Sequence, residues 1–318
     1  MGGTARRRAL ADSRVCVIMN RGSGRRDEDE VTEAVTAGLR PYCRDFALRR
    51  TGRGSDLVEM GHKAVRDGFD LIVACGGDGT QSAVAAALAG SEAVMGVLPG
   101  GTFNYFARDL GVGETIDDAL ETLRDGVPAS IDVGCIENLV FLNNVSLGAY
   151  PHILKTRESI YRRWGRSRLA AYWSVLVAMR RLRHPMDLAA TIDGETRHFT
   201  TALVFVARSA YQLDSFGLEG ADAIRNGQFA VLVAKAKRPM PLMRSALRLA
   251  FGQSAKNSDF DLIVTDDLTI TTDRSPLLVA HDGEKTMLAS PFHLRVWHGG
   301  LKVLLPADGT NKTKDAGT

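Results

Sequence analysis

Two stretches of the sequence decide the fold: LIVACGGDGT at residues 71–80 and AVMGVLPGGTFN at residues 93–104. Each is a short run of mostly apolar residues that ends in a glycine-containing turn. Continuous apolar runs of this length are typical of strands that are buried on both faces of a parallel sheet. Helical patterns follow both turns, and strands that alternate with helices predict an α/β domain.

The alternation begins nearer the N-terminus, where strands are predicted at 15–19 and 46–49 and helices at 28–39 and 55–66. The two quoted stretches are followed by an alanine-rich helix that ends near residue 89 and by a short helix at 103–109. We therefore expect an α/β domain with a parallel sheet at residues 1–133.

The pattern changes after about Asp132, where short strands are separated by turn residues. Such a pattern predicts a β-rich, mainly antiparallel and sandwich-like domain at residues 134–306, with a return of its final strand to the first domain left open. A polar tail at 307–318 is predicted to be flexible. The strands are predicted at 140–145, 188–192, 201–207, 228–234, 261–264, 268–272 and 294–296, with helices at 153–182 and about 241–251.

The composition restricts the class of protein. Of 318 residues, 40 are Lys or Arg and 37 are Asp or Glu, and a net charge of +3 argues neither for nor against nucleic acid. The cysteines at 16, 43, 75 and 135 form no Cys-x-x-Cys pair, which favours a reduced protein without structural zinc. No apolar run reaches the ~18 residues of a membrane span, and no signal-peptide core follows the basic N-terminus. We expect a cytoplasmic protein.

Three turns in the first domain, at 20–24, 76–80 and 100–104, combine glycine with polar side chains at the ends of predicted strands. Ligands of parallel α/β sheets bind at this edge. Glycine lets the backbone approach a phosphate, and the following helix start offers N–H groups, so the turns predict a polyphosphate site. Neither the P-loop pattern nor G-x-G-x-x-G directly after the first strand is present, which disfavours a P-loop NTPase or a Rossmann dehydrogenase.

Asp78 lies within the second glycine turn. A carboxylate beside phosphates repels them unless a cation lies between, so Asp78 is predicted either to hold Mg²⁺ or to order its own turn.

The segments 76–80 (GGDGT) and 99–108 (PGGTFNYFAR) resemble the catalytic domain of the diacylglycerol-kinase family, which includes bacterial lipid kinases, sphingosine kinases and ceramide kinase. The first motif is shared with NAD kinases and, loosely, with phosphofructokinases, whereas the second points to the lipid branch. Residues 20–24 look like the family's Asn-Pro-x-Ser-Gly turn with Arg for Pro, and 131–134 and 141–144 look like its domain junction. The resemblance implies a phosphofructokinase- and NAD-kinase-like first domain and an ATP-dependent lipid kinase of phospholipid biosynthesis.

The resemblance also implies the cofactors ATP and Mg²⁺, with Asp78 holding Mg²⁺ through the nucleotide. Two departures stand out: the second turn continues Thr80-Gln81-Ser82 where the family has Asn-Glu after a variable residue, and Arg225-Asn226-Gly227 replaces an acidic turn that binds magnesium in some bacterial members. The implied nucleotide-binding residues are Asn20, Ser23, Gly24, Thr51, Gly76, Gly77, Asp78, Gly79, Thr80, Gln81, Ser82, Gly101, Thr102 and Asn104.

Two Asp-Gly-Glu triplets, at 193–195 and 282–284, compete for the catalytic role that phosphoryl transfer gives to a carboxylate. Each is also a favoured hairpin turn. The second follows an apolar strand near the C-terminus, as the family's catalytic triplet does, so we assign Asp282 and Glu284 the catalytic role and leave open which of them is the base. His281 is adjacent to Asp282, but alternation along an extended segment is expected to point it to the opposite side, as a bystander.

The segments 153–184 and 235–256 are rich in basic residues interleaved with aromatic or apolar ones, and this pattern favours peripheral contact with an anionic membrane surface over nucleic acid. The expected partner is a lipid substrate, and a homodimer is left open. Two alternatives remain: an NAD kinase, and a non-catalytic membrane-associated nucleotide-binding protein. The sequence does not identify the lipid.

Overall fold

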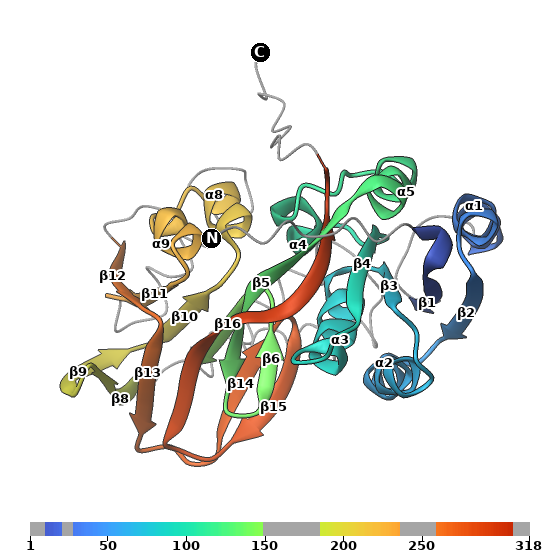
Figure 1. Cartoon of the computed structure of the whole chain (residues 1–318). Helices are drawn as coiled ribbons and strands as arrows, with labels where there is room; N and C mark the ends of the chain where they lie inside the picture. Colours follow the sequence, from blue (N-terminus) through green and yellow to red (C-terminus); the bar gives the residue numbers. More distant parts are fainter. Residues whose placement is uncertain (1–9, 21–27, 149–184, 236–258, 308–318) are drawn as a thin grey trace, which may run out of the picture. The chain divides into compact units, whose positions relative to one another are not determined.

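The computed structural model describes residues 10–20, 28–148, 185–235 and 259–307 (Figure 1). They form two compact units: the first comprises the residues before Gly134 together with those from Trp297 onward, and the second is Gly134–Val296. Strand β16 (Phe292–Leu305) runs through the boundary, so its first residues belong to the second unit and its last residues to the first.

The first unit is built on a parallel sheet with the strand order β2-β1-β3-β4. The end of β16 extends it, because Val303 lies parallel to Met95 of β4. Strands β1 and β3 are buried on both faces, as continuous apolar runs require, and this confirms the predicted α/β class. The strands span Arg14–Asn20 (β1), Asp45–Thr51 (β2), Leu71–Gly76 (β3) and Val94–Pro99 (β4).

Helices cover both faces of the parallel sheet (Figure 1). Helices α1 (Glu28–Leu39) and α5 (Ile116–Asp125) contact each other and share a core with the strand residues Val17 and Val73. Helices α2 (Leu57–Arg66) and α3 (Asp78–Leu88) contact each other and both neighbouring strands β1 and β3. Because side chains alternate along a strand, the second pair of helices covers the opposite face.

Helix α5 was not predicted, although its start signal is present in the sequence. Thr115 is the N-cap residue, and its side chain accepts a hydrogen bond from the N–H of Asp118. Helix α4 (Tyr105–Asp109) begins two residues later than predicted because Asn104 has a left-handed backbone conformation, with φ of 51°. The predicted helix at 55–66 begins with a 3-10 turn (Gly54–Asp56) before α2.

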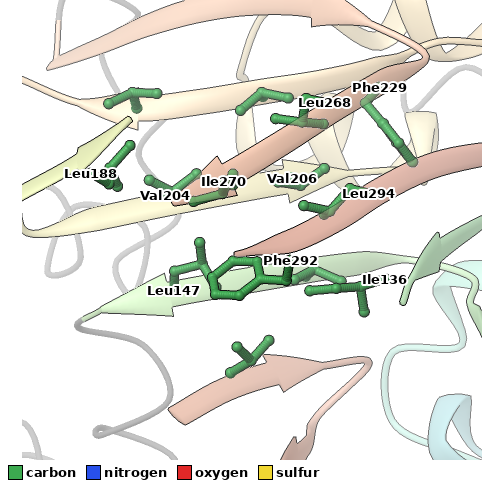
Figure 2. Packing of buried hydrophobic residues seen from close by; sticks show 14 of the residues in the cluster. Ile136, Leu147, Leu188, Val204, Val206, Phe229, Leu268, Ile270, Phe292 and Leu294 are labelled. Carbon is green, nitrogen blue, oxygen red and sulfur yellow. The ribbon is translucent and has the colours of Figure 1, made fainter. Parts of the chain in front are cut away.

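The second unit contains two sheets whose side chains meet in one core, shown in Figure 2. One sheet is antiparallel with the order β12-β11-β10-β7-β14-β15, and in the other the start of β16 pairs with β13, β13 with β8 and β8 with β9. Leu147 and Val206 come from the first sheet, and Ile270 and Phe292 from the second. The unit is therefore the predicted antiparallel sandwich.

The remaining elements of this part of the chain are as follows. Helices α8 (Ala210–Phe216) and α9 (Ala221–Arg225) share a small core with Ala230 and Leu232 of β11. The strands span Val127–Ile136 (β5), Leu139–Phe141 (β6), Asn144–Gly148 (β7), Met186–Ile192 (β8), Glu195–Thr201 (β9), Leu203–Ala207 (β10), Phe229–Ala234 (β11), Phe260–Thr265 (β12), Asp267–Thr272 (β13), Leu277–His281 (β14) and Glu284–Leu288 (β15).

One strand prediction in the second half is wrong, and another is too short. The predicted strand at 140–145 is divided into β6 and β7, because the N–H groups of Leu142 and Asn143 donate to a side chain rather than to a neighbouring strand. The predicted strand at 294–296 is confirmed, but it lies near the start of the much longer β16. Three further predictions lie outside the described residues: the helices at 153–182 and 241–251 and, except for Ala307, the tail at 307–318. Among the helices that are described, none is long and apolar enough to cross a membrane.

Candidate functional site

Three predicted nucleotide-binding residues meet at the carboxyl ends of β1 and β2. Asn20 ends β1 and lies opposite Thr51, which ends β2. The Nδ2 atom of Asn20 is 3.4 Å from Oγ1 of Thr80, to which it donates a long hydrogen bond across 60 positions of the sequence. The hydroxyl of Thr51 donates to the carboxylate of Asp56 at 3.1 Å. The parallel sheet thus brings side chains from separate turns to one edge, as expected for this architecture.

Helix α3 starts directly at the second glycine turn. Gly77 is its N-cap residue, and the Gly77 carbonyl accepts the N–H groups of Thr80 and Gln81 at 2.9 and 3.1 Å. The start of a helix carries a partial positive charge and N–H groups that precede the first intrahelical hydrogen bonds. A Cβ atom added at Gly79 would meet no heavy atom within 4 Å, so the space beside this helix start is open. A phosphate group fits such a position.

The two Gly-Gly pairs allow the second and third turns to pack against each other. A Cβ atom at Gly101 would lie 2.6 Å from Cα of Gly77 and 2.9 Å from Oδ1 of Asn104. The same Oδ1 accepts the N–H of Gly101 at 2.8 Å, and Nδ2 of Asn104 donates to the Gly101 carbonyl at 3.1 Å. Close approach of two backbones therefore explains these glycines in addition to any ligand.

Asp78 links the second turn to helix α4. Its Oδ1 atom lies 3.3 Å from the backbone nitrogen of Phe106, whose N–H it accepts. This contact agrees with the alternative in which Asp78 orders the loops, and the assignment of Mg²⁺ to Asp78 stays a prediction.

The other predicted nucleotide-binding residues differ in exposure. Gln81 is completely buried, and its Nε2 donates to the Gly76 carbonyl at 3.0 Å, so its side chain supports the turn from behind. Ser82 is also buried, whereas Thr102 is exposed. Ser23 and Gly24 lie outside the described residues.

Substitutions at two glycines separate the packing of the turns from ligand binding. Gly101→Ala is expected to lower the free energy of unfolding by about 1–3 kcal/mol, because its methyl group meets backbone that must shift. Gly79→Ala is expected to leave the melting temperature equal or higher, since its methyl group enters open space in a helix, yet to weaken MgATP binding. Thermal melting and calorimetry measure the two effects. Unchanged MgATP affinity in Gly79→Ala would place the phosphates elsewhere.

The cysteines of the parallel sheet offer no nucleophile beside the turns. Burial raises the pKa of the Cys75 thiol to about 12, and it raises that of Cys16 to about 11. Both side chains therefore stay protonated near neutral pH and act as small apolar core residues.

The two Asp-Gly-Glu triplets have the same backbone structure. In each, Asp and Gly form a two-residue turn between antiparallel strands, β8 and β9 for Asp193 and β14 and β15 for Asp282. Both aspartates have left-handed φ angles, 50° for Asp193 and 46° for Asp282. Backbone geometry alone therefore does not distinguish a catalytic triplet from a hairpin turn.

The side chains of the two aspartates differ. Asp193 is exposed, whereas Asp282 is only 9% exposed. The Asp282 carboxylate accepts three backbone N–H groups: from Leu142 at 2.6 Å, from Asn143 at 2.8 Å and from Asn144 at 3.0 Å. Its own N–H donates to the Asn144 carbonyl at 3.0 Å. These bonds fix the second Asp-Gly turn to the break between β6 and β7.

Further buried polar side chains surround this anchor. Nδ2 of Asn144 donates to Oε1 of Gln212 at 2.9 Å, and the N–H of Gln212 donates to the hydroxyl of Ser209 at 3.1 Å. Asn143 is 2% exposed, and its Oδ1 atom has no hydrogen-bond partner among the described residues. Such a concentration of buried polar groups is unusual in a β-sandwich core and marks a candidate site.

Glu284 and His281 lie directly opposite each other at the start of the hairpin. Directly paired residues of antiparallel strands project from the same face. His281 therefore lies on the same face of the hairpin as Glu284, and its expected direction opposite to Asp282 stays a prediction. Glu284 is exposed and His281 is half-buried.

Arg225 replaces the acidic turn of some bacterial family members. Its guanidinium donates to Asp222 at 2.9 Å and to Asp214 at 2.5 Å. The Asp214 hydrogen bond is the largest contribution that raises the pKa of Arg225, which stays charged. In this chain the Arg225 guanidinium thus neutralises the carboxylates of Asp214 and Asp222.

A separate hollow of about 530 Å³ lies on strands β8, β9 and β13 of the second unit. Its lining includes Asp187, His198, Thr200 and Asp273. The predicted site residues are not part of this lining.

Comparison with known proteins agrees with this architecture. Residues 14–136 match the diacylglycerol kinase catalytic domain, and residues 145–305, just over half of the chain, match the YegS C-terminal NAD kinase beta sandwich-like domain. A crystal structure of a diacylglycerol kinase from Bacillus anthracis superimposes with a TM-score of 0.70 at 21% identity, covering 93% of this chain and 98% of that one. This likeness shows the fold.

Two curated relatives match about two fifths of the chain. A probable lipid kinase YegS-like of Pseudomonas aeruginosa is 37% identical over 127 residues, which are 39% of this chain and 42% of that protein. A diacylglycerol kinase of Bacillus subtilis is 34% identical over 133 residues, 41% of this chain and 44% of that protein. The chain spans about half the length of the curated relatives it matches.

An α/β unit with glycine turns at the carboxyl ends of its strands, followed by an antiparallel sandwich, defines the class as a protein with the two-domain fold of the diacylglycerol kinases. The chain belongs to the lipid kinase family that joins a diacylglycerol kinase catalytic domain to a YegS-type C-terminal domain. The resemblance inferred from the glycine motifs is confirmed.

Proposed function

We propose that the protein is an ATP-dependent lipid kinase that transfers the γ-phosphoryl group to a hydroxyl of a lipid such as diacylglycerol. The observation that carries this proposal is the open helix start at Gly79, beside Thr80 and Asn20, in a chain of the lipid kinase family. Backbone N–H groups at such a position hold phosphates without rearrangement on binding.

The nucleotide is proposed to bind along the carboxyl edge of the parallel sheet. Asn20, Thr51 and Thr80 line one part of this edge, and the third turn with Thr102 and Asn104 lines another. A bound Mg²⁺ would neutralise the charge of the phosphates during phosphoryl transfer. Asp78, at the first position of α3, is the site residue whose oxygen atoms suit this ion.

For the reaction of the acceptor we propose different roles for Asp282 and Glu284. Three backbone donors hold the Asp282 carboxylate, which supports a role in positioning the hairpin. Glu284 is exposed two residues further, which supports its role as the group that takes the proton of the acceptor hydroxyl. The hydroxyl oxygen then bonds to the γ-phosphorus while the bond between that phosphorus and the β-phosphate oxygen breaks, and ADP leaves.

One assay separates this proposal from the alternatives. Purified protein is incubated with radiolabelled ATP and, in parallel, with diacylglycerol, monoacylglycerol, phosphatidylglycerol, ceramide, a sphingoid base, NAD or no acceptor. Transfer to at least one lipid and not to NAD is expected. Transfer to NAD alone would identify an NAD kinase, and ATP binding without any transfer would identify a non-catalytic nucleotide-binding protein.

We further propose peripheral contact with anionic membranes. Among the described residues, Phe103 of the third turn supports this contact. The residue is 59% exposed, and its ring stacks on that of Tyr105 with 5.4 Å between the ring centroids. Aromatic side chains suit the membrane interface. Flotation with anionic liposomes, compared with neutral ones and with duplex nucleic acid, tests this contact.

A further inference from the structure

The buried polar cluster around Asp282 includes a hydrogen-bond acceptor that has no role in the proposed phosphoryl transfer. Oδ1 of Asn143 is buried and has no donor among the described residues. Leaving a buried acceptor unpaired costs a folded protein roughly 1–3 kcal/mol. In native proteins such a group is usually completed by a ligand or an internal water molecule.

The backbone of Asn143 is already fully engaged, which fixes the point from which its side chain extends. Its N–H donates to Asp282 at 2.8 Å, and its carbonyl accepts the N–H groups of Arg208 and Ser209 at 2.8 and 3.2 Å. The next residue, Asn144, is held through Gln212. The buried side chain of Asn143 thus extends from a fixed backbone that itself helps to anchor the proposed catalytic hairpin.

An amide oxygen accepts hydrogen bonds and donates none. The reacting hydroxyl of a lipid has a single proton, which the proposed mechanism gives to the catalytic carboxylate. A donor that a bound lipid offers to Asn143 must therefore come from a second group of the acceptor, such as another hydroxyl, an amide N–H or an ammonium group.

We propose that Asn143 is a specificity-determining residue that selects acceptor lipids with a second hydrogen-bond donor next to the phosphorylated hydroxyl. This inference rests on the proposed lipid kinase function and narrows its acceptor, so that diacylglycerol, the example named there, is no longer the expected substrate. Monoacylglycerols, phosphatidylglycerol, ceramide and sphingoid bases belong to the selected class. A 1,2-diacylglycerol, which carries one hydroxyl and no other donor, does not.

The test uses the full chain with two lipids that differ in one donor: 1-oleoylglycerol, with two hydroxyls, and its 2-O-methyl ether, with one. The wild-type kcat/KM is expected to fall about tenfold or more on methylation, because the buried amide oxygen loses its partner. Asn143→Leu is expected to bring the ratio of the two lipids close to one. Asn143→Asp, which keeps an acceptor oxygen, is expected to retain the preference.

The ratio of two substrates on one enzyme preparation is insensitive to a general loss of folded protein. Calorimetry with MgATP confirms that each variant is folded, and Asn143→Ala replaces Asn143→Leu if the latter does not fold. Equal losses on both lipids in the variants would assign the amide oxygen to an internal water and overturn the inference. Transfer to diacylglycerol alone in the wider acceptor panel would overturn it while leaving the lipid kinase function intact, and transfer to no lipid would overturn both.

Discussion

Asp282→Asn is expected to abolish lipid phosphorylation, with at least a hundredfold loss of kcat, while MgATP still binds. An asparagine keeps one carboxyl-like oxygen and places an NH₂ group where the other accepted an N–H. Of the three donors from Leu142, Asn143 and Asn144, at least one then faces a donor in a buried position. The hairpin that carries Glu284 loses its anchor, and the unpaired groups cost roughly 1–3 kcal/mol each.

The matched control is Asp193→Asn, because Asp193 occupies the same two-residue turn with an exposed side chain. It is expected to leave both kcat and the melting temperature unchanged. Radiolabel transfer, calorimetry with MgATP and thermal melting compare the two variants. Equal losses of activity in both would remove the catalytic assignment of the second triplet.

Glu284→Gln is expected to lower kcat by about 10²–10⁴-fold without changing the melting temperature, since removing a general base acts on the chemical step alone. Glu284 is exposed, so its substitution leaves no buried group unpaired. Glu195→Gln, the equivalent change in the first triplet, is expected to have no effect on kcat. A normal kcat in Glu284→Gln combined with an inactive, fully stable Asp282→Asn would instead make Asp282 the base.

These two experiments report on different properties of one hairpin. Asp282→Asn should change both stability and activity, because its carboxylate joins the turn to the break between β6 and β7. Glu284→Gln should change activity only. Measuring both stability and activity therefore distinguishes a residue that positions the hairpin from one that accepts the proton. Activity measurements alone do not make this distinction.

The sequence identified the parallel sheet, the order of its strands along the chain and the edge at which the glycine turns lie. A continuous apolar run such as Leu71–Gly76 predicts a strand that is covered on both faces. A glycine turn directly after it predicts where that strand ends. The sequence did not predict α5, although Thr115 and Asp118 form its N-terminal capping pair. It also joined β6 and β7 into one strand, because residues 140–145 are mostly apolar and only a distant carboxylate divides them.

By itself the sequence determined the α/β-plus-sandwich architecture, the family and the set of glycine turns, because periodicity and turn chemistry are local properties. Only the tertiary structure decided which Asp-Gly-Glu triplet is anchored by buried amides, since Asp282 receives its donors from residues 138–140 positions away. The tertiary structure also showed that the backbones of Gly77 and Gly101 approach too closely for a side chain at Gly101, and that the space at Gly79 is open. It further showed that Oδ1 of Asn143 has no hydrogen-bond partner among the described residues. Contacts between distant segments have no signature in local sequence, because they depend on where the whole chain places each backbone.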